Sequence, residues 1–203
     1  MHKIILKTFT EWTKDLDLKE SRIKIFENIR DIPYVVTGIT DPERGPVELL
    51  LQNKGTCSPK HFLLGMMYQK LGIPVKYGSY PFRWGDLNVD YPENLKKMVN
   101  KLPVTPHLAL KAYINNMWVL LDATWDPPLK KVGFPVNEKW DGFTDTQNAV
   151  PATEEIIHDS IEERIEFLES DSTEQESDST EQDELIEKFC NELNRWFEEV
   201  RSG

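Results

Sequence analysis

Residues 107–122 read HLALKAYINNMWVLLD, two apolar runs that meet at the pair Asn115-Asn116. Both runs are rich in residues that favour β-strands, and asparagine tolerates the positive φ angles of a two-residue hairpin turn. The stretch therefore predicts an antiparallel hairpin in which Ile114 lies opposite Met117. Because side chains alternate between the two faces of a sheet, this pairing also predicts which residues share a face.

Counting outward from the turn brings a histidine and a carboxylate together. In a hairpin that spans residues 107–124, Ala109 pairs with Asp122, and His107 pairs with Thr124. His107 and Asp122 are then diagonal neighbours, with backbones about 5–8 Å apart and side chains within reach. A carboxylate in this position holds an imidazole in one tautomer and stabilises its cationic form. The other ring nitrogen is left to face a thiol.

The candidate thiol is Cys57, which stands where a helix is predicted to begin. It follows Gly55, and the spacing of apolar residues after it predicts a helix over 58–71. Free backbone N–H groups and the helix dipole favour a negative charge at this end and so lower a thiol pKa. We therefore predict one catalytic site from Cys57, His107 and Asp122. Taken singly, each has an ordinary interpretation as a small buried residue, a strand-edge histidine or a turn aspartate.

The flanking sequence predicts an α+β fold. Apolar residues at helical spacing extend over 9–31, as one helix or as two divided at Asp17-Leu18-Lys19-Glu20. A strand is predicted over 75–80, and a short helix over 92–101 precedes the hairpin. Residues 41–46 have the composition of a loop. The expected architecture is a cysteine-bearing helix packed on an antiparallel sheet, with helical additions at both chain ends.

The C-terminal part divides by composition. We expect a main domain over 1–150, a helix over 151–169, an acidic linker over 170–183 and an amphipathic helix over 184–203. The linker consists of two tandem heptapeptides, SDSTEQE and SDSTEQD, which lack the apolar residues needed to fold alone. The last helix is expected to fold back on the domain through its aromatic face or, together with the linker, to bind a protein partner.

The formal net charge of −11 belongs to the C-terminal part. Residues 154–183 hold thirteen acids and one base, and 184–203 hold five acids and three bases, which leaves twenty bases and seventeen acids in 1–153. A near-neutral domain without a basic run argues against nucleic-acid binding. The apolar runs are too short for a signal peptide or a membrane span. Two cysteines match neither a disulfide framework nor a metal site, so we expect a cytoplasmic, reduced protein without metal or cofactor.

Three blocks, in order, resemble the transglutaminase-like superfamily. They are Gly55-Thr56-Cys57 with its helix and the Gly72-Ile73-Pro74 turn, the strand that His107 opens, and Trp118-x-x-x-Asp122-x-Thr124. The resemblance implies a papain-like core. It also implies that Cys57 is the nucleophile, His107 the general base and acid, and Asp122 the residue that orients the histidine.

The predicted reaction is attack of the Cys57 thiolate on an amide carbonyl of a peptide or protein, which gives an acyl-enzyme. Water would complete hydrolysis, as in a peptidase or amidase, whereas an amine would complete transglutaminase-type transfer. An arylamine acetyltransferase would share the same three residues, but the chain is short for that class. The alternative is a catalytically inactive interaction module, because Ser58-Pro59 and Leu108-Ala109 replace the family's usual neighbours of the cysteine and the histidine.

Other residues near these blocks have less specific interpretations. His61 is expected on an exposed helix face, and Cys190 in the packing of the last helix. The backbone N–H of the cysteine, Gln52 and Asn53 are candidate donors to an oxyanion, although a plain loop role is expected for the two side chains. Three tryptophans in loops are predicted either to line a cleft or to pack in the core: Trp84, Trp125 and Trp140.

Overall fold

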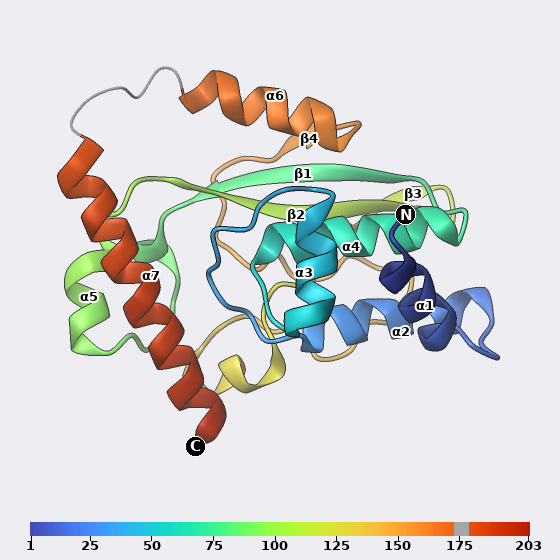
Figure 1. Ribbon diagram of the computed structural model, residues 1–203, viewed down its shortest axis with the longest axis horizontal. Coiled ribbons are helices and arrows are strands. Elements are labelled where there is room, and N and C mark those ends of the chain that lie inside the picture. The colour runs from blue at the N-terminus through green and yellow to red at the C-terminus, as the bar shows by residue number, and fades with distance from the viewer. Residues whose placement is uncertain (173–178) are drawn as a thin grey trace.

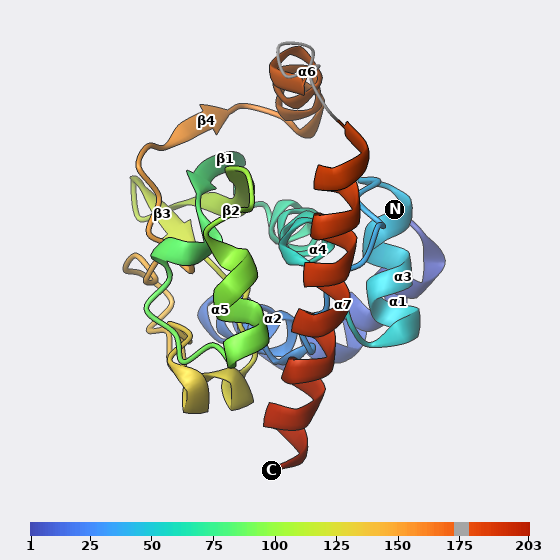
Figure 2. The same cartoon turned by 90° about the vertical axis from the view of Figure 1, so that its left-hand side faces the viewer.

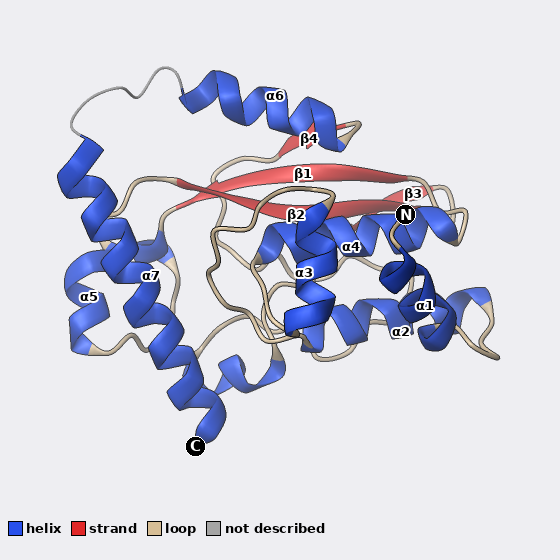
Figure 3. Cartoon of the chain, viewed as in Figure 1, coloured by secondary structure: helices blue, strands red, loops and turns tan. Residues whose placement is uncertain are grey.

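The structure is a computed structural model that describes the chain except residues 173–178. It has an α+β fold in which four antiparallel strands form one sheet in the order β3-β2-β1-β4 (Figure 1). The strands are β1 (Val75–Phe82), β2 (Thr105–Ile114), β3 (Met117–Leu121) and β4 (Ile156–His158). The helices in Figure 3 are α1 (Lys3–Trp12), α2 (Leu18–Asp31), α3 (Arg44–Gln52), α4 (Cys57–Lys70), α5 (Glu93–Val99), α6 (Ile161–Ser172) and α7 (Ser179–Ser202), with short 3-10 turns η1 (Trp84–Asp86) and η2 (Pro127–Val132). The predicted fold class is confirmed.

The hairpin of β2 and β3 has the predicted register from its turn to the pair Leu110–Leu121. Both turn asparagines have positive φ, 50° and 64°, as a two-residue turn requires. The pairing then stops one residue before Asp122, which was predicted to continue it. The backbone N–H of Asp122 instead donates to the hydroxyl of Thr146, at 2.8 Å. Asp122 therefore begins a loop, although it still lies beside the start of β2.

Helix α4 packs across β1 and β2 and is itself covered by α2 and α3 (Figure 1). This central position explains why α4 is buried around most of its circumference rather than along one stripe. The core between α4 and the sheet includes Phe62, Leu63, Leu64, Met67, Leu108, Leu110 and Leu121. The predicted packing of the cysteine-bearing helix on an antiparallel sheet is thus present. The sheet packs against the face of α4 that α2 and α3 leave free. The first residue of α4 therefore lies near the end of the sheet where β1 stops and β2 starts.

A second, aromatic core lies at that end of the sheet, and α7 folds back onto it as expected. Its rings belong to Tyr34, Trp84, Trp125, Phe134, Phe189, Trp196 and Phe197. Arg201, near the end of α7, donates two hydrogen bonds to the carboxylate of Asp126, at 2.8 and 2.7 Å. In Figure 2, α7 crosses in front of the end of α4. The aromatic face of α7 is therefore covered by the chain's own core rather than exposed to a protein partner.

The helical stretch predicted over 9–31 is divided into two helices at the break suggested for residues 17–20, where Asp17 and Glu20 form a reciprocal cap that starts α2. One N-terminal expectation needs correction. The loop predicted over 41–46 contains the start of α3, where the side chain of Asp41 accepts the backbone N–H of Arg44 at 2.6 Å. Glycine and proline are compatible with the first turn of a helix, so their turn-like composition was misleading.

The helix predicted over 151–169 begins later, at Ile161. Residues Ile156–His158 form β4 instead, because the open edge of β1 pairs with their backbone and Ser79 hydrogen-bonds the His158 ring at 3.0 Å. Residues 173–178 of the predicted linker lie outside the described part, and its ends belong to α6 and α7 rather than to a loop. Across the helices that the structure describes, none is both long and apolar enough to cross a membrane.

Candidate active site

The three residues singled out by the sequence lie together where α4 and β2 begin and β3 has just ended. Cys57 is the first residue of α4, His107 is the third of β2, and Asp122 follows β3 directly. Nε2 of His107 lies 2.8 Å from Oδ2 of Asp122. The histidine is 3% exposed and the aspartate 1% exposed, so water competes little for this contact.

The thiol of Cys57 faces the imidazole of His107. Because Nε2 of the ring is engaged by Asp122, Nδ1 is the nitrogen left for the sulfur. Burial acts to raise the pKa of the Cys57 thiol, but hydrogen bonding to His107 and the charge of that ring outweigh it. The backbone N–H of Leu108 also supports the anion. The pKa of Cys57 therefore lies below its ordinary value, as a nucleophilic thiol requires.

The histidine and the aspartate stabilise each other as ions. Burial alone would lower the pKa of His107, yet the Asp122 carboxylate and the Cys57 thiol raise it to about 10. Burial acts to raise the pKa of Asp122, but the charge of His107 holds it well below the usual range. The carboxylate also accepts the backbone N–H of Ala149 at 2.8 Å. The arrangement therefore favours the charged form of each group: a thiolate, an imidazolium and a carboxylate.

His61 belongs to this polar network, although the sequence placed it on an exposed face. It is fully buried, with Nδ1 2.9 Å from the carbonyl oxygen of Cys57 and Nε2 accepting the backbone N–H of Ala123 at 3.0 Å. Burial lowers its pKa to about 4, so the ring is neutral and Nδ1–H is the donor to the carbonyl. The spacing of four residues from Cys57 was the available signal, because it places both on one helix face.

Lys60 is a second buried group that sequence reasoning missed. Its ammonium donates to three backbone carbonyls, those of Arg30 at 3.0 Å, Ile32 at 2.9 Å and Thr124 at 2.7 Å. These bonds tie the first turn of α4 to the end of α2 and to the segment that carries Asp122. Burial lowers the pKa of Lys60 to about 7. Nothing in the sequence marks this lysine, since lysine is rarely buried.

A pocket of about 440 Å³ opens beside Cys57. Its walls come from the loop 34–40, the start of α4, the segment 102–106 and the two C-terminal helices. Of the three candidate tryptophans, Trp84 lines this pocket, whereas Trp125 and Trp140 pack in the aromatic and main cores. A volume of several hundred Å³ suits a small ligand or a peptide segment.

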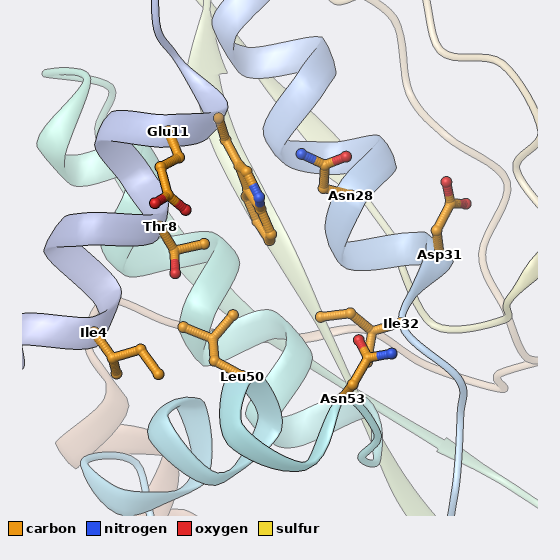
Figure 4. A pocket seen from close by; sticks show the side chains of 9 residues that line it. Ile4, Thr8, Glu11, Asn28, Asp31, Ile32, Leu50 and Asn53 are labelled. Carbon is orange, nitrogen blue, oxygen red and sulfur yellow. The ribbon is translucent and has the colours of Figure 1, made fainter.

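The hydroxyl of Thr56, the residue before Cys57, has no hydrogen-bond partner among the described residues. Its Oγ1 is buried, and the residue lines the Cys57 pocket. The two side chains proposed as oxyanion donors from the sequence lie elsewhere. Gln52 hydrogen-bonds Glu48 at 2.8 Å, and Asn53 lines a different hollow, of about 350 Å³, between α1, α2 and α3 (Figure 4).

The site thus combines an activated thiol, a protonated histidine that can supply a proton, and an adjacent pocket. These are the parts that acyl transfer by a cysteine requires. Over the part of the chain that the structure describes, no group of three or more histidine, cysteine, aspartate or glutamate side chains is arranged to hold a metal ion.

Comparison with known proteins adds little to this geometry. No protein-family model matches the chain, and no curated protein matches it. One solved structure that it resembles is described as a putative cysteine protease from Cytophaga hutchinsonii, with a TM-score of 0.43 and 18% sequence identity. The likeness covers 77% of this chain and 50% of that chain, so this chain spans about half of the other's length. A likeness this distant carries no argument, and the family predicted from the motifs stays a prediction.

Proposed function

We propose that this protein is a cysteine-nucleophile enzyme that acts on amide bonds of peptides or proteins through a thioester at Cys57. One observation carries the proposal: the thiol of Cys57 faces an imidazole whose far nitrogen lies 2.8 Å from the buried carboxylate of Asp122. A histidine between a thiol and a carboxylate can both stabilise the thiolate and move a proton. The transglutaminase-like motif supports the same roles.

The reaction proceeds in two halves. The Cys57 thiolate attacks the amide carbonyl carbon and pushes the carbonyl electrons onto oxygen. When the tetrahedral intermediate collapses, the C–N bond breaks and His107 gives its proton to the departing amine, which leaves a thioester. Neutral His107 then takes a proton from the incoming water or amine, whose attack releases the acyl product and restores the thiolate. Asp122 stabilises the imidazolium throughout.

Two donors at the start of α4 are placed to stabilise the oxyanion. The backbone N–H groups of a helix's first turn have no partner within the helix, and that of Cys57 is one of them. The hydroxyl of Thr56 is the other, since it is buried beside the pocket without a hydrogen bond. A buried, unpartnered donor costs about 1–3 kcal/mol in the free protein, which binding of an oxyanion would offset.

The inactive-module alternative makes different demands on the same residues. A purely structural network requires hydrogen bonds, but it does not require a thiol with a lowered pKa beside an open pocket. Attack by the Cys57 thiolate requires the cysteine to be reduced, and both cysteines are free. We therefore propose that the protein works in a reducing compartment, the cytoplasm.

A thioester at Cys57 is the test. With p-nitrophenyl acetate, we expect a burst of one p-nitrophenolate per chain and an acetyl group on Cys57 by peptide mass spectrometry. The burst should be absent in Cys57→Ser and retained in the matched control Cys190→Ser. Decay of the thioester with and without added glycinamide separates hydrolysis from transfer. No burst, or acetylation of Cys57 that is equally fast in His107→Ala, would favour the inactive module.

A further inference from the structure

One charged group in the Cys57 pocket has no side-chain hydrogen bond or ion pair to any residue that the structure describes. Arg164, in α6, lines the pocket and is only 5% exposed. Its Nε is buried without a hydrogen bond, and within the described part of the chain its guanidinium makes no ion pair. A buried guanidinium is normally paired, because it keeps its charge at all working pH values and pays heavily for lost water.

Two other arginines of this chain show how the cost of removing a guanidinium from water is met. The half-buried Arg201 makes two hydrogen bonds to the carboxylate of Asp126. Arg22 also has an unpartnered Nε, but its guanidinium lies 4.4 Å from the centre of the Phe143 ring, where a cation–π contact compensates. Among the described residues, Arg164 has neither a carboxylate nor a facing ring, and the negative charge that acts on it is that of the Cys57 thiolate, so a bound carboxylate would complete its surroundings.

The rest of the pocket indicates what carries that anion. Among the described residues that line it, Arg164 alone bears a permanent charge, and most of the others are apolar. Val36, Leu102, Leu168 and Phe189 represent this apolar wall. A single guanidinium in such a wall matches one carboxylate on an apolar stem, because its fork of N–H donors fits the two carboxylate oxygens.

We propose that Arg164 selects substrates by binding a carboxylate close to the amide that Cys57 attacks. This inference rests on the proposed function. The carboxylate belongs either to an acidic side chain or to the free C-terminus of a peptide. Both place the same group in the pocket, and the experiments below distinguish them. The charge of Arg164 also favours the Cys57 thiolate, so its role in binding has to be separated from an effect on the thiol.

A pair of alkylating reagents makes that separation. Iodoacetate and iodoacetamide both react with the Cys57 thiolate and release iodide, but only iodoacetate carries a carboxylate. Because the thiolate fraction affects both rates equally, the ratio of the two rates at Cys57 reports anion binding alone. The full-length chain is labelled, and rates at Cys57 are read by peptide mass spectrometry, with free cysteine as the reference.

We expect the iodoacetate-to-iodoacetamide ratio at Cys57 to exceed that of free cysteine. In Arg164→Gln it should fall by about tenfold, the scale of a charge-assisted hydrogen bond. Arg164→Lys should lie between the two, because it keeps the charge and loses the fork. Arg44→Gln, an exposed arginine whose side chain is 71% exposed, is the matched control and should leave the ratio unchanged.

Protection of the wild-type chain needs no variant and identifies the source of the carboxylate. Labelling by iodoacetamide is measured with N-acetylphenylalanine against its amide, and with the side-chain acid N-acetylglutamic acid 1-amide against N-acetylglutaminamide. Protection by the first acid but not by its amide supports C-terminal recognition, and protection by the second acid supports recognition of an acidic side chain. Equal protection within both pairs overturns the inference, as does a ratio that Arg164→Gln leaves unchanged.

The two proposals fail in different ways. If Cys57 reacts with iodoacetamide as slowly as an ordinary thiol, the proposed function is wrong whatever the ratio. If Cys57 reacts fast but its ratio equals that of free cysteine, the proposed function stands and the role of Arg164 is wrong.

Discussion

Cys57 and Cys190 line the same pocket, yet their surroundings give the two thiols opposite character. Both are free and partly exposed. Burial acts to raise the pKa of both thiols. At Cys57 the contacts with His107 outweigh burial and lower the pKa, whereas at Cys190 burial raises it. Residue type and pocket are therefore the same, and only the neighbours differ. The comparison teaches that a histidine and a helix start, rather than a cysteine in a cleft, define the candidate nucleophile.

The position in the helix accounts for part of this difference. Cys57 is the first residue of α4, where backbone N–H groups have no partner within the helix, whereas Cys190 lies inside α7, where those groups are already bonded. The other part is His107, which reaches Cys57 from β2. Cys190 packs against the aromatic core instead.

Replacing His107 should abolish most of the difference in reactivity between the Cys57 and Cys190 thiols. In His107→Ala, the Cys57 pKa should return to the ordinary thiol value near 8.5, so its iodoacetamide rate at pH 6 should fall by about a hundredfold. Site-resolved mass spectrometry checks this, with Cys190 in the same sample as the internal control. An unchanged Cys57 rate would show that the helix start alone activates the thiol.

Neutralising the Asp122 carboxylate should reduce the difference in reactivity between the two thiols by a smaller factor than replacing His107. Asp122→Asn removes the charge that holds His107 protonated, so we expect the Cys57 rate at pH 6 to fall by about tenfold. The free energy of unfolding should fall by about 3 kcal/mol, because a buried charge loses its partner. Urea unfolding and labelling are compared with Asp159→Asn, whose side chain is 77% exposed. Wild-type reactivity in Asp122→Asn would contradict the role of Asp122.

Changing His61 should act on stability more than on the thiol. His61→Gln loses the bonds to the Cys57 carbonyl and the Ala123 N–H, which should cost about 2 kcal/mol of unfolding free energy. Because His61 is neutral and does not face the sulfur, Cys57 should lose less reactivity than in either preceding variant. A larger loss than in Asp122→Asn would move His61 from a positioning role into the chemistry.

Removing the second thiol should have the smallest effect. We expect Cys190→Ser to lower the free energy of unfolding by about 1 kcal/mol or less and to leave Cys57 labelling unchanged. Thermal unfolding and labelling rates measure both. A fall in Cys57 reactivity would show that the two thiols are coupled across the pocket.

Much of the site was predictable because its determinants are local. The turn Asn115-Asn116 sets the hairpin register, and the register brings His107 beside Asp122. Cys57 was placed by a helix start, which depends on neighbouring residues alone. The same local logic predicted β1, the short helix before the hairpin and the aromatic face of α7.

What the sequence did not reveal depends on contacts between distant segments. The burial of His61 and Lys60 follows from α4 being covered on both sides, which no apolar stripe of its own predicts. The strand β4 exists because the edge of β1 is open, and short apolar runs fit a strand or a helix equally. Arg164 in the wall of the pocket requires α6 to lie along that edge. Tertiary packing decided each of these.

The pH dependence of alkylation at both cysteines, read in one sample of the wild-type chain, tests the central claim most directly. The lowered pKa of Cys57 keeps its thiolate as pH falls, and His107, with a pKa of about 10, keeps its proton until the pH rises through that value. We therefore predict that the Cys57 rate rises to its plateau at a lower pH than the Cys190 rate, because burial raises the pKa of the Cys190 thiol. Two parallel curves with an ordinary thiol midpoint would contradict an activated nucleophile at Cys57.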